Sequence, residues 1–263
     1  FIYHVQRKHF STWLKARTEF ALEGQIFRGK LAEHASVEDY RQHIVKTIHL
    51  FRKHRLRSIV TDFDRRSFDS LARFTRIGGG SLGGKARGIA FVKMLLGETG
   101  PRDKFERVQI SVPETIVIGT DVFERFLDEN QLRDEVIHEN DDQRLNKLFQ
   151  QAHFPDDVAI DLAACLEVVT YPIAVRSSSL LEDSHHLPFA GIYDTFMLTN
   201  DQPELSTRLQ LLLDAVKNVY VSTFSAKAKA YLRSTTYRLE EERMAVIIQR
   251  VVGSKRGNRF YPI

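Results

Sequence analysis

The stretch that decides the fold of this chain is GGGSLGGK at residues 78–85, a glycine-rich turn that ends in Lys85. A second stretch, YPIAVRSSS at residues 171–179, places Arg176 between an apolar run and three serines, 91 residues after Lys85. Each stretch sets a fixed positive charge beside small residues, which let backbone N–H groups approach an anion. The two stretches therefore predict two walls of a phosphate site, and a nucleotide is the first ligand to expect.

Composition limits the classes of protein that fit. The 263 residues carry a formal net charge of +4, with 43% hydrophobic and 27% charged residues, as in a soluble protein of one large or two modest domains. No apolar run is long enough to cross a bilayer and no signal peptide is present, so we expect a cytoplasmic protein without a membrane partner. The single cysteine, Cys165, excludes a disulfide framework and cysteine-rich zinc sites, and its apolar-periodic surroundings predict a buried helical position.

Nucleic acid is a weaker candidate partner. Basic clusters occur at residues 52–57, 65–66 and 255–259, but acidic runs such as residues 139–142 offset them and no aromatic residues are interleaved. We therefore expect no nucleic-acid partner. Binding of that kind would also show an affinity that falls steeply with salt.

Hydrophobic periodicity and capping signals predict the following elements. SVED at residues 36–39 resembles a capping box and begins a helix that reaches residue 54. Residues 130–169 are predicted to be a charged, helical, linker-like region with a break at Pro155. The other expected helices span residues 4–27, 67–74, 86–96, 121–127, 202–220 and 222–233, and the expected strands span 57–63, 108–112, 115–118, 173–176, 193–198 and 244–252.

The glycine turn fits the spacing G-x-x-x-x-G-K when Gly79 and Gly84 are the fixed glycines. A Walker A loop would continue with Ser or Thr, but this chain has Ala86, and we recognise no strand directly before the turn. A P-loop is therefore disfavoured. Alone, the turn would equally suit a flexible linker, and Arg176 with its serines favours the phosphate site.

Five motifs in order resemble a known family, the ATP-binding N-terminal region of pyruvate phosphate dikinase and phosphoenolpyruvate synthase, which belongs to the ATP-grasp group. The resemblance covers about residues 78–252. Its motifs are GGK at 83–85, VP at 112–113, VRSS at 175–178 followed by ED at 182–183, FAG with a later Thr at 189–195, and AVIIQRV at 245–251.

The resemblance implies a mixed α/β fold of ATP-grasp type, in which residues 77–263 form an incomplete nucleotide-binding domain after a mainly helical extension at 1–76. It implies that Lys85 and Arg176 bind the phosphates and serve as the catalytic residues. Gly191 and Thr195 would line a loop above the phosphates, and Gln249 with the backbone near Val251 would lie along the adenine edge. The implied cofactor-binding residues are Gly84, Lys85, Arg176, Ser177, Gly191, Thr195, Gln249 and Val251.

The implied cofactors are ATP and Mg²⁺, with the metal ligands outside this chain. His185 and His186 lack the spacing of a metal site, so we expect no metal bound by this chain itself. Because the chain opens on Phe1 and stops at Ile263, we expect a fragment of a longer polypeptide. The fragment would bind ATP weakly and turn over nothing.

The full-length protein would be a dikinase-type phosphotransferase that passes a phosphoryl group from ATP to a histidine on another domain and then to an acceptor. The phosphohistidine and acceptor-binding domains would lie in the missing part of the polypeptide. The acceptor and the oligomeric state, including a homo-oligomer, are left open. The alternative is a degenerate, non-catalytic module that senses a nucleotide and has a regulatory role.

Overall fold

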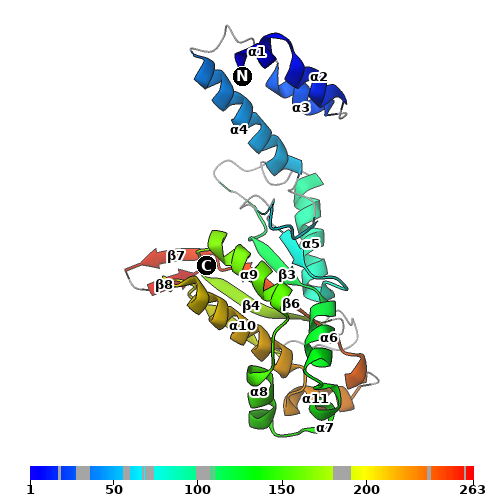
Figure 1. Cartoon of the computed structure of the whole chain (residues 1–263). Helices are drawn as coiled ribbons and strands as arrows, with labels where there is room; N and C mark the ends of the chain where they lie inside the picture. The colour runs from blue at the N-terminus through cyan, green and yellow to red at the C-terminus, as the bar shows by residue number, and fades with distance from the viewer. Residues whose placement is uncertain are drawn as a thin grey trace. The chain divides into compact units, whose positions relative to one another are not determined.

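The computed structural model describes residues 1–16, 19–27, 36–55, 60–66, 68, 74–98, 108, 110–179, 191–235, 238–257 and 259–263. The chain divides into two compact units, Phe1–Arg57 and Ser58–Ile263 (Figure 1). The sheet of the second unit includes the strand Thr61–Asp62 and most of the strand Phe74–Ile77 within residues 1–76, which were expected to form a mainly helical extension.

The first unit is helical, as its periodicity predicted. The helix expected at residues 4–27 is instead three short helices, and the first two are separated at Lys8, which adopts a left-handed φ of 57°. Leu14, Leu22 and Ile26 form a small core against one side of the fourth helix. The helices are α1 (Ile2–Gln6), α2 (His9–Ala16), α3 (Phe20–Ile26) and α4 (Val37–Arg55).

Helix α4 begins where the capping signal predicted. The Oγ of Ser36 accepts a hydrogen bond from the backbone N–H of Asp39 at 3.0 Å, which satisfies one of the unpaired amides of the first turn.

Replacing Ser36 with alanine is expected to destabilise α4 by about 1 kcal/mol, because this amide loses its acceptor. Hydrogen exchange at the α4 backbone amides measures the effect, and exchange should speed up about fivefold. Ser36→Asp keeps an acceptor and is the matched control. Equal exchange rates in Ser36→Ala and the unaltered chain would contradict the capping role.

The second unit is built on a mixed six-stranded sheet in the order β1-β2-β3-β6-β4-β5. The first three strands pair in parallel, and β6 joins the sheet antiparallel to both β3 and β4. Strand β5 pairs antiparallel with β4. A separate hairpin, β7–β8, follows β6 and was not predicted. The strands are β1 (Thr61–Asp62), β2 (Phe74–Ile77), β3 (Thr115–Ile118), β4 (Ile173–Ser179), β5 (Thr195–Leu198), β6 (Met244–Arg250), β7 (Gly253–Arg256) and β8 (Arg259–Pro262).

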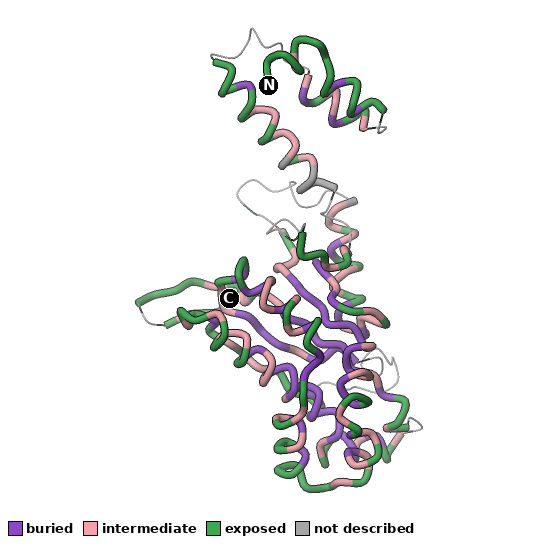
Figure 2. Tube along the Cα trace, viewed as in Figure 1, coloured by how far each residue is buried: buried purple, intermediate pink, exposed green. Residues whose placement is uncertain are grey.

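Helices cover both faces of this sheet. Alternate strand residues point to opposite faces, so Val117 and Ile247 join the core with α5, while Ile118 and Ile248 join the larger core with α10. Figure 2 shows the buried residues concentrated along these strands. The helices are α5 (Gly83–Glu98), α6 (Thr120–Glu129), α7 (Arg133–His138), α8 (Asp142–Gln151), α9 (Asp156–Val168), α10 (Leu205–Ser222) and α11 (Ala226–Arg233), with a short 3-10 turn at Leu239–Glu241.

Residues 130–169 are part of this core, so the prediction of a linker-like region was wrong. Leu145, Phe149 and Leu162 are fully buried on the inner sides of α8 and α9. Pro155 does interrupt the helices, because it precedes the first residue of α9. Cys165 is buried in α9 as predicted, and burial raises the pKa of its thiol, so it is not an activated nucleophile.

Three smaller predictions also need correction. Val108 and residues 110–112 form no strand, and the strand expected at residues 57–63 is confined to Thr61–Asp62 among the residues described there. The helix expected at residues 67–74 falls mostly outside the described residues, and Phe74 belongs to β2. Among the described helices, none is both long and apolar enough to cross a membrane.

Candidate phosphate and nucleotide site

The glycine turn connects β2 to α5. Strand β2 ends at Ile77, directly before Gly78, so the statement that no strand precedes the turn was wrong. Four residues are too short for periodicity to separate a strand from its surroundings. The turn is therefore the first connection of a β2–α5–β3 unit with parallel strands.

The first half of the turn is held against α6. The backbone N–H of Gly79 donates to Oδ2 of Asp121 at 2.7 Å, and that of Ser81 donates to Oγ1 of Thr120 at 2.9 Å. Both acceptors belong to the first turn of α6. The sequence predicted that backbone amides of this stretch approach an anion, but these two amides hold the shape of the turn instead.

The second half of the turn seats α5 on β4. A Cβ on Gly83 would lie 1.6 Å from the carbonyl oxygen of Ser178, and Gly83 has a left-handed φ of 70°. The Ser178 Oγ accepts from the N–H of Ala86 at 3.0 Å and donates to the carbonyl of Leu82 at 2.8 Å. Ser178 belongs to the VRSS motif, but it was not predicted to be a site residue. The run of three serines after Arg176 was the feature of the sequence that could have indicated its role.

This contact brings Lys85 to the Arg176 segment, as the sequence predicted. The Lys85 Nζ donates to Oγ of the fully buried Ser177 at 3.0 Å. Ser177 is one residue beyond the last β4–β5 pair, Arg176 opposite Thr195. Two cationic side chains 91 positions apart in the sequence therefore come from one short region of the fold.

Arg176 in turn contacts Gln249 on β6. The Arg176 Nη1 donates to Gln249 Oε1 at 3.4 Å, and Gln249 Nε2 donates to Oγ1 of Thr115 at 3.1 Å. Thr115 is opposite Gln249 in the β3–β6 pairing. The sequence analysis did not predict that Thr115 belongs to the site. A hydroxyl residue at the start of an otherwise apolar strand was the feature that could have indicated it.

The remaining predicted residues make fewer contacts with the region around Lys85 and Arg176. Gly84 is buried in the first turn of α5, and Thr195 is exposed on β5. Gly191 is exposed, with its carbonyl accepting from the Nζ of Lys227. No described contact links Gly191 to Lys85 or Arg176. The motif residues Glu182, Asp183, His185, His186, Phe189 and Ala190 lie outside the described residues.

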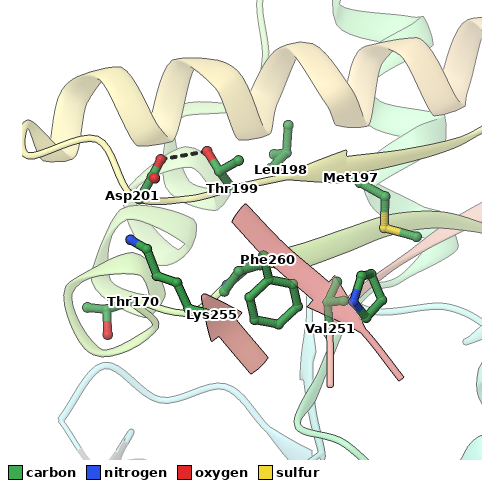
Figure 3. Close-up of a pocket in the computed structure, with 10 residues that line it drawn as sticks. Thr170, Met197, Leu198, Thr199, Asp201, Val251, Lys255 and Phe260 are labelled. Atoms are coloured by element: carbon green, nitrogen blue, oxygen red, sulfur yellow. Dashed lines mark hydrogen bonds between the residues drawn. The ribbon is translucent and has the colours of Figure 1, made fainter. Parts of the chain in front are cut away.

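An apolar pocket lies beside the end of β5 and the β7–β8 hairpin (Figure 3). Alternation from Thr195 places Met197 on the same face of the sheet as Arg176, and Met197 is 67% exposed. The pocket has a volume of about 370 Å³. Its apolar lining is Pro172, Met197, Leu198, Val251, Phe260 and Pro262, and its polar lining is Thr170, Thr199, Asp201 and Lys255.

Two details define this pocket. The Val251 amide donates to the Pro172 carbonyl at 2.9 Å, so that N–H is already engaged. Phe260 comes from the β7–β8 hairpin, and its ring lies between the labelled side chains in Figure 3. The hairpin therefore supplies one wall of the pocket, and the segment just before β4, strand β5 with the residues after it, and the residue after β6 supply the other.

The cationic part of the site contains no metal-binding cluster among its described side chains. Across the portion of the chain that the structure describes, no three His, Cys, Asp or Glu residues are grouped as a metal site requires. Lys85 and Arg176 instead suit an anion, because an ammonium and a planar guanidinium donate charge-assisted hydrogen bonds to phosphate oxygens.

Comparison with known proteins identifies the family. Residues 80–258 match the family described as pyruvate phosphate dikinase, AMP/ATP-binding domain. The chain is 25% identical over 155 residues to the uncharacterized phosphotransferase YvkC of Bacillus subtilis, covering 58% of this chain and 17% of that protein. It is 30% identical over 91 residues to phosphoenolpyruvate synthase of Aeropyrum pernix, covering 35% of this chain and 10% of that protein.

A third relative is rifampicin phosphotransferase of Bacillus subtilis, 23% identical over 158 residues, with 54% of this chain and 17% of that protein covered. The chain thus spans less than a fifth of each of these relatives. The family match covers well over half of the chain and contains both the glycine turn from Gly80 onward and the Arg176 segment. The chain therefore belongs to the pyruvate phosphate dikinase AMP/ATP-binding domain family, with the mixed α/β, ATP-grasp-like fold expected of it.

Proposed function

We propose that this chain is the ATP-binding part of a dikinase-type phosphotransferase, and that Lys85 and Arg176 hold the phosphates of ATP. The observation that carries the proposal is the contact of the Lys85 Nζ with Ser177, the residue next to Arg176. The contact places the Lys85 ammonium beside the same part of β4 that carries Arg176, and an ammonium and a guanidinium at one part of a strand favour a ligand with several anionic oxygens. As a phosphoryl group moves, the same charges would stabilise the charge that develops on it.

The adenine base of ATP would occupy the apolar pocket. Ligand sites are typically apolar hollows with a few polar groups that fix the orientation of the ligand. This pocket has that composition, and one of its lining residues, Val251, is two residues beyond Gln249 in the sequence. Another lining residue, Met197, lies on the same sheet face as Arg176, so we propose that an extended ligand reaches from the pocket to Arg176. The flat aromatic faces of a purine suit a lining that includes Phe260 and Met197 better than a charged phosphate group would.

Phosphoryl transfer would need groups outside these residues. We propose that a histidine on another domain takes the phosphoryl group, and that carboxylates beyond this chain hold Mg²⁺. Two of the relatives are named for different activities, because one is a phosphoenolpyruvate synthase and the other is a rifampicin phosphotransferase. The acceptor is therefore not assigned by the ATP-binding domain. A full-length protein that binds ATP but transfers no phosphoryl group would instead favour the nucleotide-sensing alternative.

Calorimetric titration of the chain with MgATP, inorganic triphosphate with magnesium, and adenosine tests the two-part site. We expect MgATP to bind more tightly than either partial ligand, because only MgATP reaches both the cationic pair and the pocket. Absence of MgATP binding by the folded chain, or equal affinities for MgATP and adenosine, would contradict the proposal.

Replacing Phe260 with alanine separates the two halves of the site. Stacking of a base on an aromatic ring contributes about 1–3 kcal/mol, so MgATP affinity should fall at least about fivefold. Affinity for inorganic triphosphate should stay unchanged, because that ligand has no base. A loss shared equally by both ligands would instead indicate a general distortion of the hairpin.

A further inference from the structure

Thr115 is a buried hydroxyl at the edge of the site. It begins β3, is 1% exposed, and is followed by the apolar residues of the strand. Its hydroxyl donates to the carbonyl of Pro113 at 2.9 Å. A hydroxyl has one hydrogen and two lone pairs. With its hydrogen used by Pro113, Thr115 can face Gln249 only as an acceptor.

This fixes which end of the Gln249 amide faces which neighbour. The NH₂ end donates to Thr115 at 3.1 Å, so the carbonyl end points to Arg176, whose Nη1 donates to it at 3.4 Å. A guanidinium has donors and no acceptor, so the opposite orientation would set two donors against each other. The contact with Thr115 and the contact with Arg176 therefore each require the same orientation of the Gln249 amide.

We propose that Thr115 is a positioning residue for the nucleotide site, acting on Arg176 through the oriented amide of Gln249. The proposal rests on the proposed ATP-binding function. A held carbonyl on one side of the guanidinium limits its orientations and leaves its other N–H groups for a phosphate. Thr115 touches no nucleotide in this scheme. Its effect depends entirely on Gln249.

The test uses Thr115→Val, which keeps the shape of the side chain and removes its hydroxyl, with Thr115→Ser as the matched control. The loss of a neutral hydrogen bond predicts a threefold to tenfold weaker MgATP affinity for Thr115→Val, about the range that such bonds contribute. Thr115→Ser should bind within about twofold of the unaltered chain. Circular dichroism and the unfolding temperature establish that both variants are folded.

A double-mutant cycle distinguishes positioning from a general structural effect. In a Gln249→Ala background, Thr115→Val should cause no further loss of MgATP affinity, because the amide it orients is gone. The same loss in both backgrounds would overturn the proposal.

A second readout needs no nucleotide. The side-chain NH₂ resonances of Gln249, assigned as those lost in Gln249→Ala, should shift in Thr115→Val and stay in place in Thr115→Ser. If the unaltered chain bound no MgATP while these resonances shifted as expected, the ATP-binding proposal would fail and the contact would stand. Resonances that do not move in folded Thr115→Val would overturn the positioning role itself.

Discussion

Replacement of Lys85 or Arg176 by alanine is expected to weaken MgATP binding by more than about tenfold, or roughly 1.4 kcal/mol. Hydrogen bonds to charged groups contribute about 1.5–3 kcal/mol each, and each variant removes both such bonds and a full positive charge. The two residues are not equivalent. Lys85 supplies a point charge from the first turn of α5, and Arg176 a planar donor set from β4. Calorimetry on the folded variants measures both losses.

Arg87→Ala is the matched control for this prediction. Arg87 has the same charge, lies on the same helix and is exposed. Residues two apart on a helix do not share a face, so Arg87 should point away from the phosphates and its loss should change MgATP affinity by less than about twofold. If Arg87→Ala weakened binding as much as Lys85→Ala, the effect would be one of overall charge and the assignment of Lys85 would be wrong.

The sequence was sufficient for much of the fold where a local pattern is decisive. Ser36 predicted the start of α4, and Pro155 the break before α9. The glycine turn predicted a helix N-terminus, which begins at Gly83. Periodicity failed where charges on an outer face mask a narrow apolar stripe, as for Leu145 in α8. It also failed for β2, whose four residues gain their strand character from pairing with β3.

In the candidate site, too, contacts that follow from local motifs could be predicted, and contacts that depend on the tertiary fold could not. The approach of Lys85 to the Arg176 segment followed from two motifs, and the contact with Ser177 agrees with that expectation. The role of Thr115 depends on a cross-strand register between residues 134 positions apart, which no local pattern specifies. The pocket could not be predicted either, because its wall at Phe260 depends on a hairpin whose position relative to β5 is a tertiary feature.

Gly83→Ala is expected to destabilise the second unit by at least about 3 kcal/mol, an effect found only for a few severe mechanisms such as backbone strain and overpacking. Two costs add. Alanine in the left-handed region is unfavourable by about 1–2 kcal/mol, and its Cβ would collide with the Ser178 carbonyl at 1.6 Å. The obstacle is backbone at the end of a central strand, so it cannot rotate away. Relief requires α5 to separate from β4, which breaks both hydrogen bonds of the Ser178 hydroxyl.

Gly88→Ala gives the opposite expected result on the same helix. A Cβ at Gly88 meets nothing within 4 Å, and alanine in a helix interior is more stable than glycine by about 0.5–1 kcal/mol. Urea unfolding of the two variants should therefore shift in opposite directions from the unaltered chain. Gly83→Ala should also lose MgATP binding, because Lys85 follows two residues later and depends on the same seating of α5. A Gly83→Ala variant with unaltered stability would show that the close approach of α5 to β4 is not needed, and the glycine would then have to be explained by the ligand.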